Sequence, residues 1–317
     1  MLPRALREPV GLAYLLARAA DTVADTRVLA REARLGQLET LRTAFGGTPV
    51  AVASVASACR AHQGSAAEAE LLGRLPEAIA RLDALPPDDR DAVRTVLATL
   101  TSGMVFDLET FPGEDSAHLT ALETLDDLDR YTYLVAGCVG EFWTKIHAAH
   151  RRRLRGWDVS AMSADGVRFG KALQLTNVLR DIPNDLRHGR CYVPAAALAS
   201  HGLVPSDLLA PDAMPKLLPL YEALLESAGA HYRAGWRYTL AIPRREWRMR
   251  LACAWPLLIG EATLAALRRH SNPLAATAPV KISRAQVRAI VTRSIVTVWS
   301  NAALTAQAAR LRDHAVA

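Results

Sequence analysis

The sequence has few cysteines and no recognisable secretory signal. Cysteine occurs four times in 317 residues, at widely scattered positions and without a CxxC pair. No apolar core of a signal peptide is present near the N-terminus. This pattern does not suit a disulfide scaffold, and we expect reduced thiols in a cytoplasmic protein.

Long uninterrupted apolar runs are also missing. The most apolar stretch, residues 251–267, contains Pro256, Gly260 and Glu261. It falls short of the roughly 20 apolar residues that a membrane-spanning helix needs. We therefore expect a buried core helix there, and we predict no transmembrane helix.

Alternating strand patterns, low-complexity linkers and short repeats are nearly absent, and a period of 3.6 residues dominates instead. The expected helices are 9–26, 28–44, 50–62, 66–83, 88–110, 116–149, 160–188, 216–240, 244–270 and 282–312. Turn signals such as Pro86-Pro87-Asp88-Asp89 separate them. The chain, 1–317, is predicted to form one all-α domain.

The net charge of +6 is modest, but it includes two basic clusters, at 150–155 and 244–250. No nucleic-acid-binding motif accompanies them, so we expect no nucleic-acid partner and interpret both clusters as solvated helix ends. Peripheral contact with anionic lipid stays open as an alternative. A metal site at His147-x2-His150 is not expected, because further ligands are missing and surface histidines account for the pair.

The sequence does contain two aspartate pairs with the same spacing, Asp21/Asp25 and Asp181/Asp185. Four residues place both carboxylates on one face of a helix, where like charges repel. A cation between them would remove that repulsion. Carboxylate oxygens suit Mg²⁺, and arginines beside them suit phosphate. Glu123/Asp127 has the same spacing without such neighbours and is taken as chance.

The neighbours of each pair extend it into a polar stripe. On the first helix Tyr14 and Arg18 precede the aspartates at helical spacing, and on the second Gln174 and Asn177 do. Both stripes are embedded in apolar residues, so we expect them to line an internal cavity in which buried charges are paired or bind metal. Pro183 lies between the second two aspartates and is expected to kink that helix.

Together these residues resemble the squalene/phytoene synthase family, the head-to-head prenyl diphosphate synthases. The resemblance covers nearly the whole chain in order and is highly specific. It rests on Tyr14-x3-Arg18-x2-Asp21-x3-Asp25, Tyr131-x-Tyr133-x2-Ala136-Gly137-x2-Gly140, Gln174-x2-Asn177-x2-Arg180-Asp181-x3-Asp185 and Gly189-Arg190-Cys191-Tyr192-Val193-Pro194. The segments 255–266 and 280–282 are closer to squalene synthases than to phytoene synthases.

The resemblance implies an all-helical terpenoid-synthase bundle with a central cavity that binds two farnesyl diphosphates and Mg²⁺. The implied metal ligands are the four aspartates, which assist departure of diphosphate. Residues implied to bind substrate are Tyr14, Arg18, Gln174, Asn177, Arg180, Arg187, Arg190, Tyr192 and Lys281. Tyr131 is implied to assist proton removal, although a phenol with a pKa near 10 needs help from nearby positive charge.

The implied reaction passes through presqualene diphosphate to squalene, with hydride from NADPH, as in sterol or hopanoid biosynthesis. The chain has no GxGxxG fingerprint, but the family has no Rossmann unit either, so NADPH stays in the prediction. Glycines 137 and 140 predict close approach of a neighbouring helix or of substrate, with ordinary helix packing as the alternative.

The family pattern also includes an earlier segment, with a Ser-x2-Phe motif that contributes to diphosphate binding. The sequence begins at Met1 without it, so we expect either an internal start or a missing wall of the site. Two alternatives to the reductive enzyme remain open. One is a non-reductive synthase that makes presqualene diphosphate, dehydrosqualene or phytoene, and the other is a non-catalytic scaffold member of the family.

Overall fold

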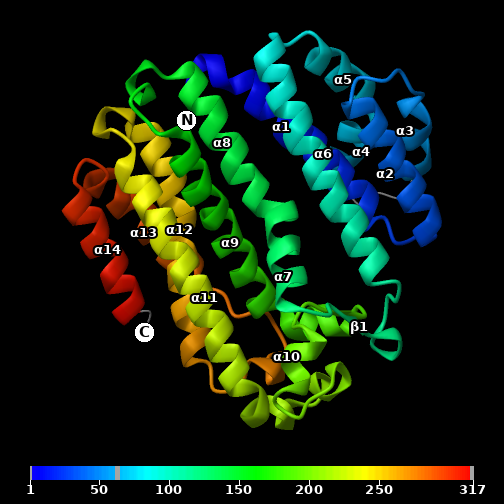
Figure 1. Ribbon diagram of the computed structural model, residues 1–317, viewed down its shortest axis with the longest axis vertical. Helices are drawn as coiled ribbons and strands as arrows, with labels where there is room; N and C mark the ends of the chain where they lie inside the picture. Colours follow the sequence, from blue (N-terminus) through cyan, green and yellow to red (C-terminus); the bar gives the residue numbers. More distant parts are fainter. Residues whose placement is uncertain (1, 61–64, 315–317) are drawn as a thin grey trace. The chain divides into compact units, whose positions relative to one another are not determined.

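A computed structural model describes residues 2–60 and 65–314 of the chain. Helices account for nearly all of its regular structure, as the sequence predicts (Figure 1). The contacts divide the chain into two compact units, each taken here by itself. The N-terminal unit comprises residues 2–110 and 142–150, and the C-terminal unit comprises residues 111–141 and 151 onward. The prediction of a single domain therefore stays a prediction.

The N-terminal unit is built around α1, which packs against α2, α5 and α6. Its apolar face is buried through Leu12, Leu16 and Val23, which are one and two turns apart along the helix. The helices of this unit are α1 (Arg4–Asp25), α2 (Arg31–Phe45), α3 (Val52–Arg60), α4 (Ala66–Gly73), α5 (Leu75–Asp83), α6 (Pro87–Thr110) and the later part of α8 (Cys138–His150).

One helix predicted in this unit is divided in two. The expected helix 66–83 ends at Gly73 and starts again at Leu75. Pro76 lies in the first turn of the second helix, where its missing N–H costs nothing, whereas in a helix interior it would remove a hydrogen bond.

The C-terminal unit has the long helices α9 and α11 packed side by side as its centre. Helix α12 packs on both of them (Figure 1). Its elements are η1 (Ser116–His118), β1 (Thr120–Ala121), α7 (Leu125–Thr132), η2 (Tyr133–Gly137), the start of α8, η3 (Arg152–Leu154), α9 (Val159–Arg187), β2 (Arg190–Cys191), α10 (Ala195–Ala199), η4 (Pro205–Leu209), η5 (Pro211–Ala213), α11 (Met214–Ala241), η6 (Arg244–Glu246), α12 (Trp247–Arg269), η7 (Pro273–Ala275), α13 (Arg284–Thr297) and α14 (Asn301–His314).

The predicted helix 116–149 is wrong over its first nine residues. Thr124 caps α7, because its hydroxyl accepts from the Asp127 backbone N–H at 3.2 Å. The Asp127 carboxylate accepts from the Thr124 backbone N–H at 2.9 Å in return. This capping box fixes the start of the helix at Leu125, and it gives Asp127 a structural role.

Further along, α7 and α8 are joined by η2, a turn of π-helix, before α8 continues. The predicted close approach at the glycines is confirmed, and the neighbour is helix α9. A Cβ on Gly140 would lie 1.9 Å from the backbone oxygen of Gly166, and one on Gly170 would lie 2.2 Å from that of Ala136. Side chains at these two positions would therefore push the helices apart.

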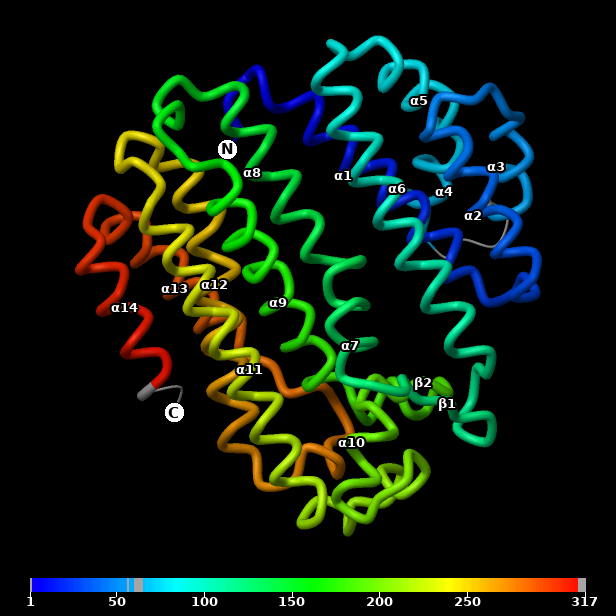
Figure 2. Tube along the Cα trace, viewed as in Figure 1, coloured from blue at the N-terminus to red at the C-terminus, as the bar shows by residue number. Residues whose placement is uncertain are grey.

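Helix α9 ends in a turn that leads directly into β2. Gly189 has φ of +77°, a left-handed conformation that glycine adopts without strain. The strand then pairs in parallel with β1, Thr120 opposite Arg190 and Ala121 opposite Cys191 (Figure 2). This short pairing holds the segment 190–193 against the end of α9.

The apolar stretch near residue 256 is the core helix α12, as predicted. The stretch 244–269 has the length and mean hydropathy of a membrane span, contrary to our expectation from its sequence. However, 72% of its most apolar 18 residues are buried inside the protein. The predicted helix 282–312 is divided between α13 and α14. β-branched residues 295–298 and Asn301 favour the break, since all have low helix propensity.

Candidate active site

The first polar stripe lies on one unbroken helix, α1, as predicted. Tyr14, Arg18, Asp21 and Asp25 occupy successive turns, and most of the residues between them are buried, although Leu15 is exposed. The stripe itself is open to solvent: the Tyr14 side chain is 68% exposed, and Arg18 and Asp25 are exposed too. The expectation of an enclosed stripe is therefore wrong for this helix.

Charges on this stripe are only partly compensated. The Arg18 guanidinium contacts the Asp21 carboxylate at 2.6 Å and the Glu68 carboxylate of α4 at 2.5 Å. Burial raises the pKa of Asp21 above its usual value, and the negative charge of Asp25 adds to the increase despite Arg18. The hydrogen bond to Glu68 is the main cause that raises the pKa of Arg18.

Glu68 is a member of this cluster that the sequence did not reveal. It lies 50 residues from Arg18 on a different helix, and its flanking residues Ala67 and Ala69 carry no signal of a site. Only the packing of α4 against α1 brings the two side chains together.

The second polar stripe lies on α9, which remains helical from Val159 to Arg187 with Pro183 inside it. The proline does not interrupt the helix, so Asp181 and Asp185 keep their helical spacing. The Arg180 side chain folds onto the neighbouring Asp181 carboxylate, with Nε 2.9 Å from Oδ1. That hydrogen bond is the main cause that raises the pKa of Arg180, and the charge of Asp185 contributes in the same direction.

Tyr131 of α7 meets the second stripe through Gln174. The Gln174 amide donates to the Tyr131 hydroxyl oxygen at 3.4 Å, and the Asn177 amide donates to the Gln174 carbonyl oxygen at 3.4 Å. The Tyr131 ring stacks on Tyr192 with ring centres 4.7 Å apart, and Phe111 meets the edge of Tyr192 at 4.9 Å. Four residues predicted for the site, from three separate motifs, thus form one connected cluster.

A small hollow, too narrow to admit a water molecule, adjoins this cluster. Asp185, Arg190 and Tyr192 line it, together with apolar residues of α9 and the buried thiol of Cys191. Burial raises the pKa of the Cys191 thiol to about 12, so it stays protonated at neutral pH. The hollow therefore combines one carboxylate, one guanidinium and one phenol on a largely apolar wall.

The remaining two predicted cations lie elsewhere in this unit. Arg187 is exposed in the last turn of α9, and Lys281 is exposed in the loop before α13. Both stay predictions that depend on the resemblance.

Carboxylates that could hold a metal are divided between the units, with one pair in each. Among the residues that the structure describes, no three His, Cys, Asp or Glu side chains converge as a metal-binding group. Mg²⁺ commonly uses one or two protein carboxylates, with water and phosphate as its other ligands. The uncompensated charge around Asp21 and Asp25 fits such a partial site.

The histidine pair is structural, but it is not on the surface as expected. His147 is fully buried and its Nδ1 bonds the Trp143 carbonyl oxygen at 2.9 Å. His150 Nε2 bonds the nearly buried Asp89 carboxylate at 2.7 Å. The two imidazoles thus serve different partners within the N-terminal unit.

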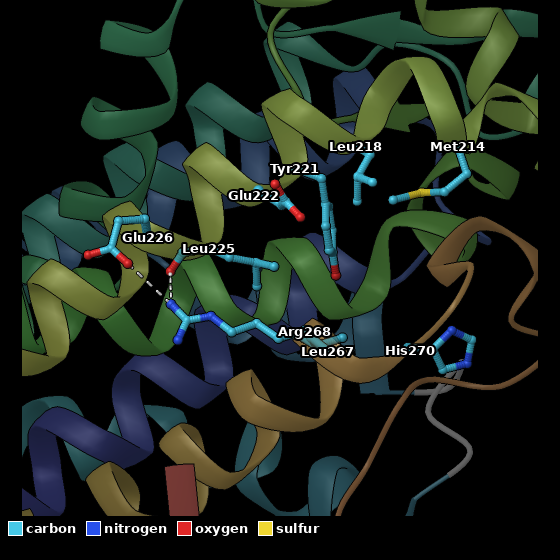
Figure 3. Close-up of a pocket in the computed structure, with 9 residues that line it drawn as sticks. All are labelled: Met214, Leu218, Tyr221, Glu222, Leu225, Glu226, Leu267, Arg268 and His270. Carbon is cyan, nitrogen blue, oxygen red and sulfur yellow. Dashed lines mark hydrogen bonds and ion pairs between the residues drawn. The ribbon is translucent and has the colours of Figure 1, made fainter. Parts of the chain in front are cut away.

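A second pocket, of about 320 Å³, lies between α11 and α12 (Figure 3). Apolar side chains such as Met214 and Leu218 form one part of its wall, and Glu226 and Arg268 lie at its other end, 3.5 Å apart. The Arg268 guanidinium also donates to the Leu225 carbonyl oxygen. None of these residues belongs to the predicted site.

Comparison with known proteins now settles the family. The profile described as squalene/phytoene synthase matches residues 1–286. The chain belongs to the squalene/phytoene synthase family. This is a family of head-to-head prenyltransferases, which agrees with the resemblance seen in the motifs.

Individual relatives carry different activities in their names. The squalene synthase of Schizosaccharomyces pombe is 25% identical over 294 residues, covering 93% of this chain and 60% of that protein. The presqualene diphosphate synthase of Zymomonas mobilis is 29% identical over 241 residues, 74% of this chain and 67% of that one. The 15-cis-phytoene synthase of Enterobacter agglomerans is 39% identical over 117 residues, so that the match spans 37% of either chain.

Solved structures agree on the fold. The complex of TcSQS with the ligand BPH1237 has a TM-score of 0.75 at 21% identity, covering 99% of this chain and 85% of that one. Squalene synthase HpnC from Alicyclobacillus acidocaldarius has a TM-score of 0.59 at 25% identity, with 84% and 85% covered. The all-helical terpenoid-synthase fold predicted from the motifs is confirmed.

Proposed function

We propose that this chain is a prenyltransferase that condenses two farnesyl diphosphates head to head, through presqualene diphosphate, and reduces the product to squalene with NADPH. The observation that supports it most is the cluster of Tyr131, Gln174, Asn177 and Tyr192 on and beside α9. The same helix carries Arg180, Asp181 and Asp185 toward its C-terminal end.

Asp21 and Asp25, and separately Asp181 and Asp185, are the residues that would hold Mg²⁺. The donor set fits, since it is made of hard oxygens and since the pKa of Asp21 is raised, first by burial and then by the negative charge of Asp25, which a cation would offset. When bound, the metal supplies Lewis-acid stabilisation of the departing diphosphate. Activity is proposed to need both pairs.

Arg180 and Arg190 would bind phosphate oxygens, because a guanidinium offers planar, bidentate hydrogen bonding. Arg180 is pre-oriented by its bond to Asp181, and Arg190 lines the hollow with Asp185. Arg18, Tyr14, Arg187 and Lys281 are proposed to contribute to substrate binding on the strength of the family motifs.

Tyr131 would assist the proton loss that closes the cyclopropane ring of presqualene diphosphate. Its hydroxyl oxygen accepts a hydrogen bond from Gln174, which favours the phenolate, the form of the side chain that can take up the proton. Its stacking on Tyr192 fixes the ring, and both side chains are almost fully buried. A dry aromatic wall also protects a carbocation from capture by water.

Purified protein should be incubated with farnesyl diphosphate and Mg²⁺, with and without NADPH, and the products identified by mass spectrometry. Squalene formed only with NADPH supports the reductive enzyme. Presqualene diphosphate or dehydrosqualene formed in both conditions would replace it with the non-reductive alternative. Because several relatives are named phytoene synthases, geranylgeranyl diphosphate should be tested in parallel.

The scaffold alternative is tested by the aspartates. Asp21→Asn and Asp181→Asn should each abolish turnover while leaving the circular dichroism spectrum unchanged, because a carboxamide keeps the size but not the charge. Absence of any turnover in the wild-type chain with both farnesyl diphosphate and geranylgeranyl diphosphate would favour the scaffold.

A further inference from the structure

The two basic clusters seen in the sequence meet in the C-terminal unit. The Glu246 carboxylate, only 5% exposed, binds Arg151 of the first cluster at 2.8 Å and Arg153 at 3.2 Å. Glu246 itself lies inside the second cluster, between Arg245 and Trp247. One carboxylate therefore joins the clusters into a single surface.

Most of the positive charge on this surface faces solvent. The exposed arginines are Arg152, Arg153 and Arg155 from the first cluster and Arg244, Arg245 and Arg248 from the second. Arg250 differs from them, because it is fully buried, and our interpretation of the clusters as solvated helix ends is wrong for this residue.

Arg250 connects the basic clusters to the turn between α13 and α14. Its guanidinium donates to the Val298 carbonyl oxygen at 3.0 Å and to Asn301 Oδ1 at 2.7 Å. The Trp247 and Trp299 rings lie 6.0 Å apart, which places the start of α12 beside the end of α13. Figure 1 shows these helices as neighbours.

Three large apolar side chains are exposed at this turn. Ile295 is 52% exposed, Val296 is 77% exposed and Trp299 is 50% exposed. The opposite side of α13 is packed, since the buried Ser294 hydroxyl accepts from the Trp255 indole N–H at 2.7 Å. The three apolar side chains and the six exposed arginines are called the basic–aromatic face below.

We propose that the basic–aromatic face docks on an anionic lipid membrane. Arginines there are attracted to headgroup phosphates, while tryptophan and aliphatic side chains enter the boundary between headgroups and acyl chains. A nucleic acid would satisfy the arginines but not Ile295 and Val296. A second copy of the chain would oppose like charges, six against six, across the contact. The proposal does not depend on which reaction the chain catalyses.

Co-sedimentation with vesicles tests this directly. Full-length protein should bind vesicles of phosphatidylcholine mixed with phosphatidylglycerol, and should bind vesicles of phosphatidylcholine alone far more weakly. Each arginine near an anionic surface contributes a factor of about 5, so Arg244→Glu with Arg248→Glu should weaken binding at least ~25-fold. The triple variant Ile295→Ser, Val296→Ser, Trp299→Ser should weaken it more than about tenfold.

Matched controls are available in the N-terminal unit. Val28→Ser changes a side chain that is 74% exposed, close to the value for Val296. Arg4→Glu with Arg42→Glu reverses two exposed charges outside the face. Both controls should bind the anionic vesicles as the wild type does.

A second measurement covers the case in which a variant fails to fold. Brominated lipid in the anionic vesicles should quench part of the wild-type tryptophan fluorescence, because Trp299 enters the headgroup region. Absence of wild-type binding, or equal binding by the wild type and both face variants, would overturn the proposal. So would a triple variant that turns a dimer into a monomer in ultracentrifugation while vesicle binding stays unchanged.

Discussion

Substitution of Gly140 by alanine tests the closest helix contact in the C-terminal unit. The added Cβ would lie 1.9 Å from the Gly166 backbone oxygen, and backbone cannot turn aside as a flexible side chain can. The start of α8 and α9 must therefore separate locally. Insertion of one methyl group into such a contact costs about 1–3 kcal/mol or more. Alanine's better helix propensity returns only about 1 kcal/mol of this.

We expect Gly140→Ala to lower the free energy of unfolding by up to about 2 kcal/mol, the packing cost less the gain in helix propensity, measured by urea titration with circular dichroism. Turnover should fall as well. Gly140 lies three residues after η2, and η2 joins α8 to α7, the helix that carries Tyr131, so a shift of α8 also displaces Tyr131. Gly36→Ala is the matched control. Gly36 is also inside a helix, but a Cβ there meets nothing within 4 Å, so alanine should stabilise by about 0.5–1 kcal/mol.

A change of stability in the same direction for Gly140→Ala and Gly36→Ala would contradict the close contact inferred at Gly140. Gly170→Ala provides an independent check from the opposite helix, because its Cβ would lie 2.2 Å from the Ala136 backbone oxygen. Equal stability of Gly140→Ala and wild type would refute the reasoning from close approach.

Three further predictions concern titratable groups. Because the pKa of Asp21 is raised from 3.8 in the folded state, mainly by burial and then by Asp25, its penalty is absent below pH ~3.8 and grows until the pH passes the folded pKa. Asp21→Asn should therefore raise the free energy of unfolding of metal-free protein at pH 7 by a few tenths of a kcal/mol, a small value because the side chain is partly exposed, and Mg²⁺ should stabilise the wild type more than the variant; destabilisation of the variant would contradict this. Tyr131→Phe should lower turnover about 10²–10⁴-fold in the product assay without a change in the urea midpoint, and full activity would exclude its role in proton transfer. Burial raises the pKa of Glu261, whose carboxylate lies 2.9 Å from Arg312, so Arg312→Gln should cost about 1–3 kcal/mol at pH 8 and progressively less as the pH falls and protonation removes the buried charge; a loss independent of pH would refute this.

Helix content and the positions of the long helices could be predicted from periodicity alone. Helix 160–188 is found at Val159–Arg187, because Asp158 caps its start and Gly189 ends it, and both signals are local. The segment 116–124 could not be predicted in this way. It is held by the parallel pairing of Thr120 with Arg190, a contact between residues 70 positions apart.

Prediction of the site succeeded where residues share a helix and was incomplete where they do not. Gln174 and Asn177 are three residues apart, so their contact follows from helical geometry. The stacking of Tyr131 on Tyr192 depends on the turn at Gly189 and the pairing of β2, which spacing does not encode. The contact of Glu68 with Arg18 was missed because it depends on the packing of α4 against α1, which residue spacing does not encode either.

The two aspartate pairs, alike in sequence, differ in their electrostatics. Around the first, the Arg18 guanidinium binds the Asp21 and Glu68 carboxylates, and the pKa of Asp21 is raised by burial and then by the negative charge of Asp25. Around the second, the Arg180 guanidinium binds the neighbouring Asp181 carboxylate. Each pair therefore has one arginine beside it, but the arginine of the first pair is shared with a carboxylate from another helix. Equal spacing in the sequence thus conceals unequal compensation of the negative charge at the two pairs.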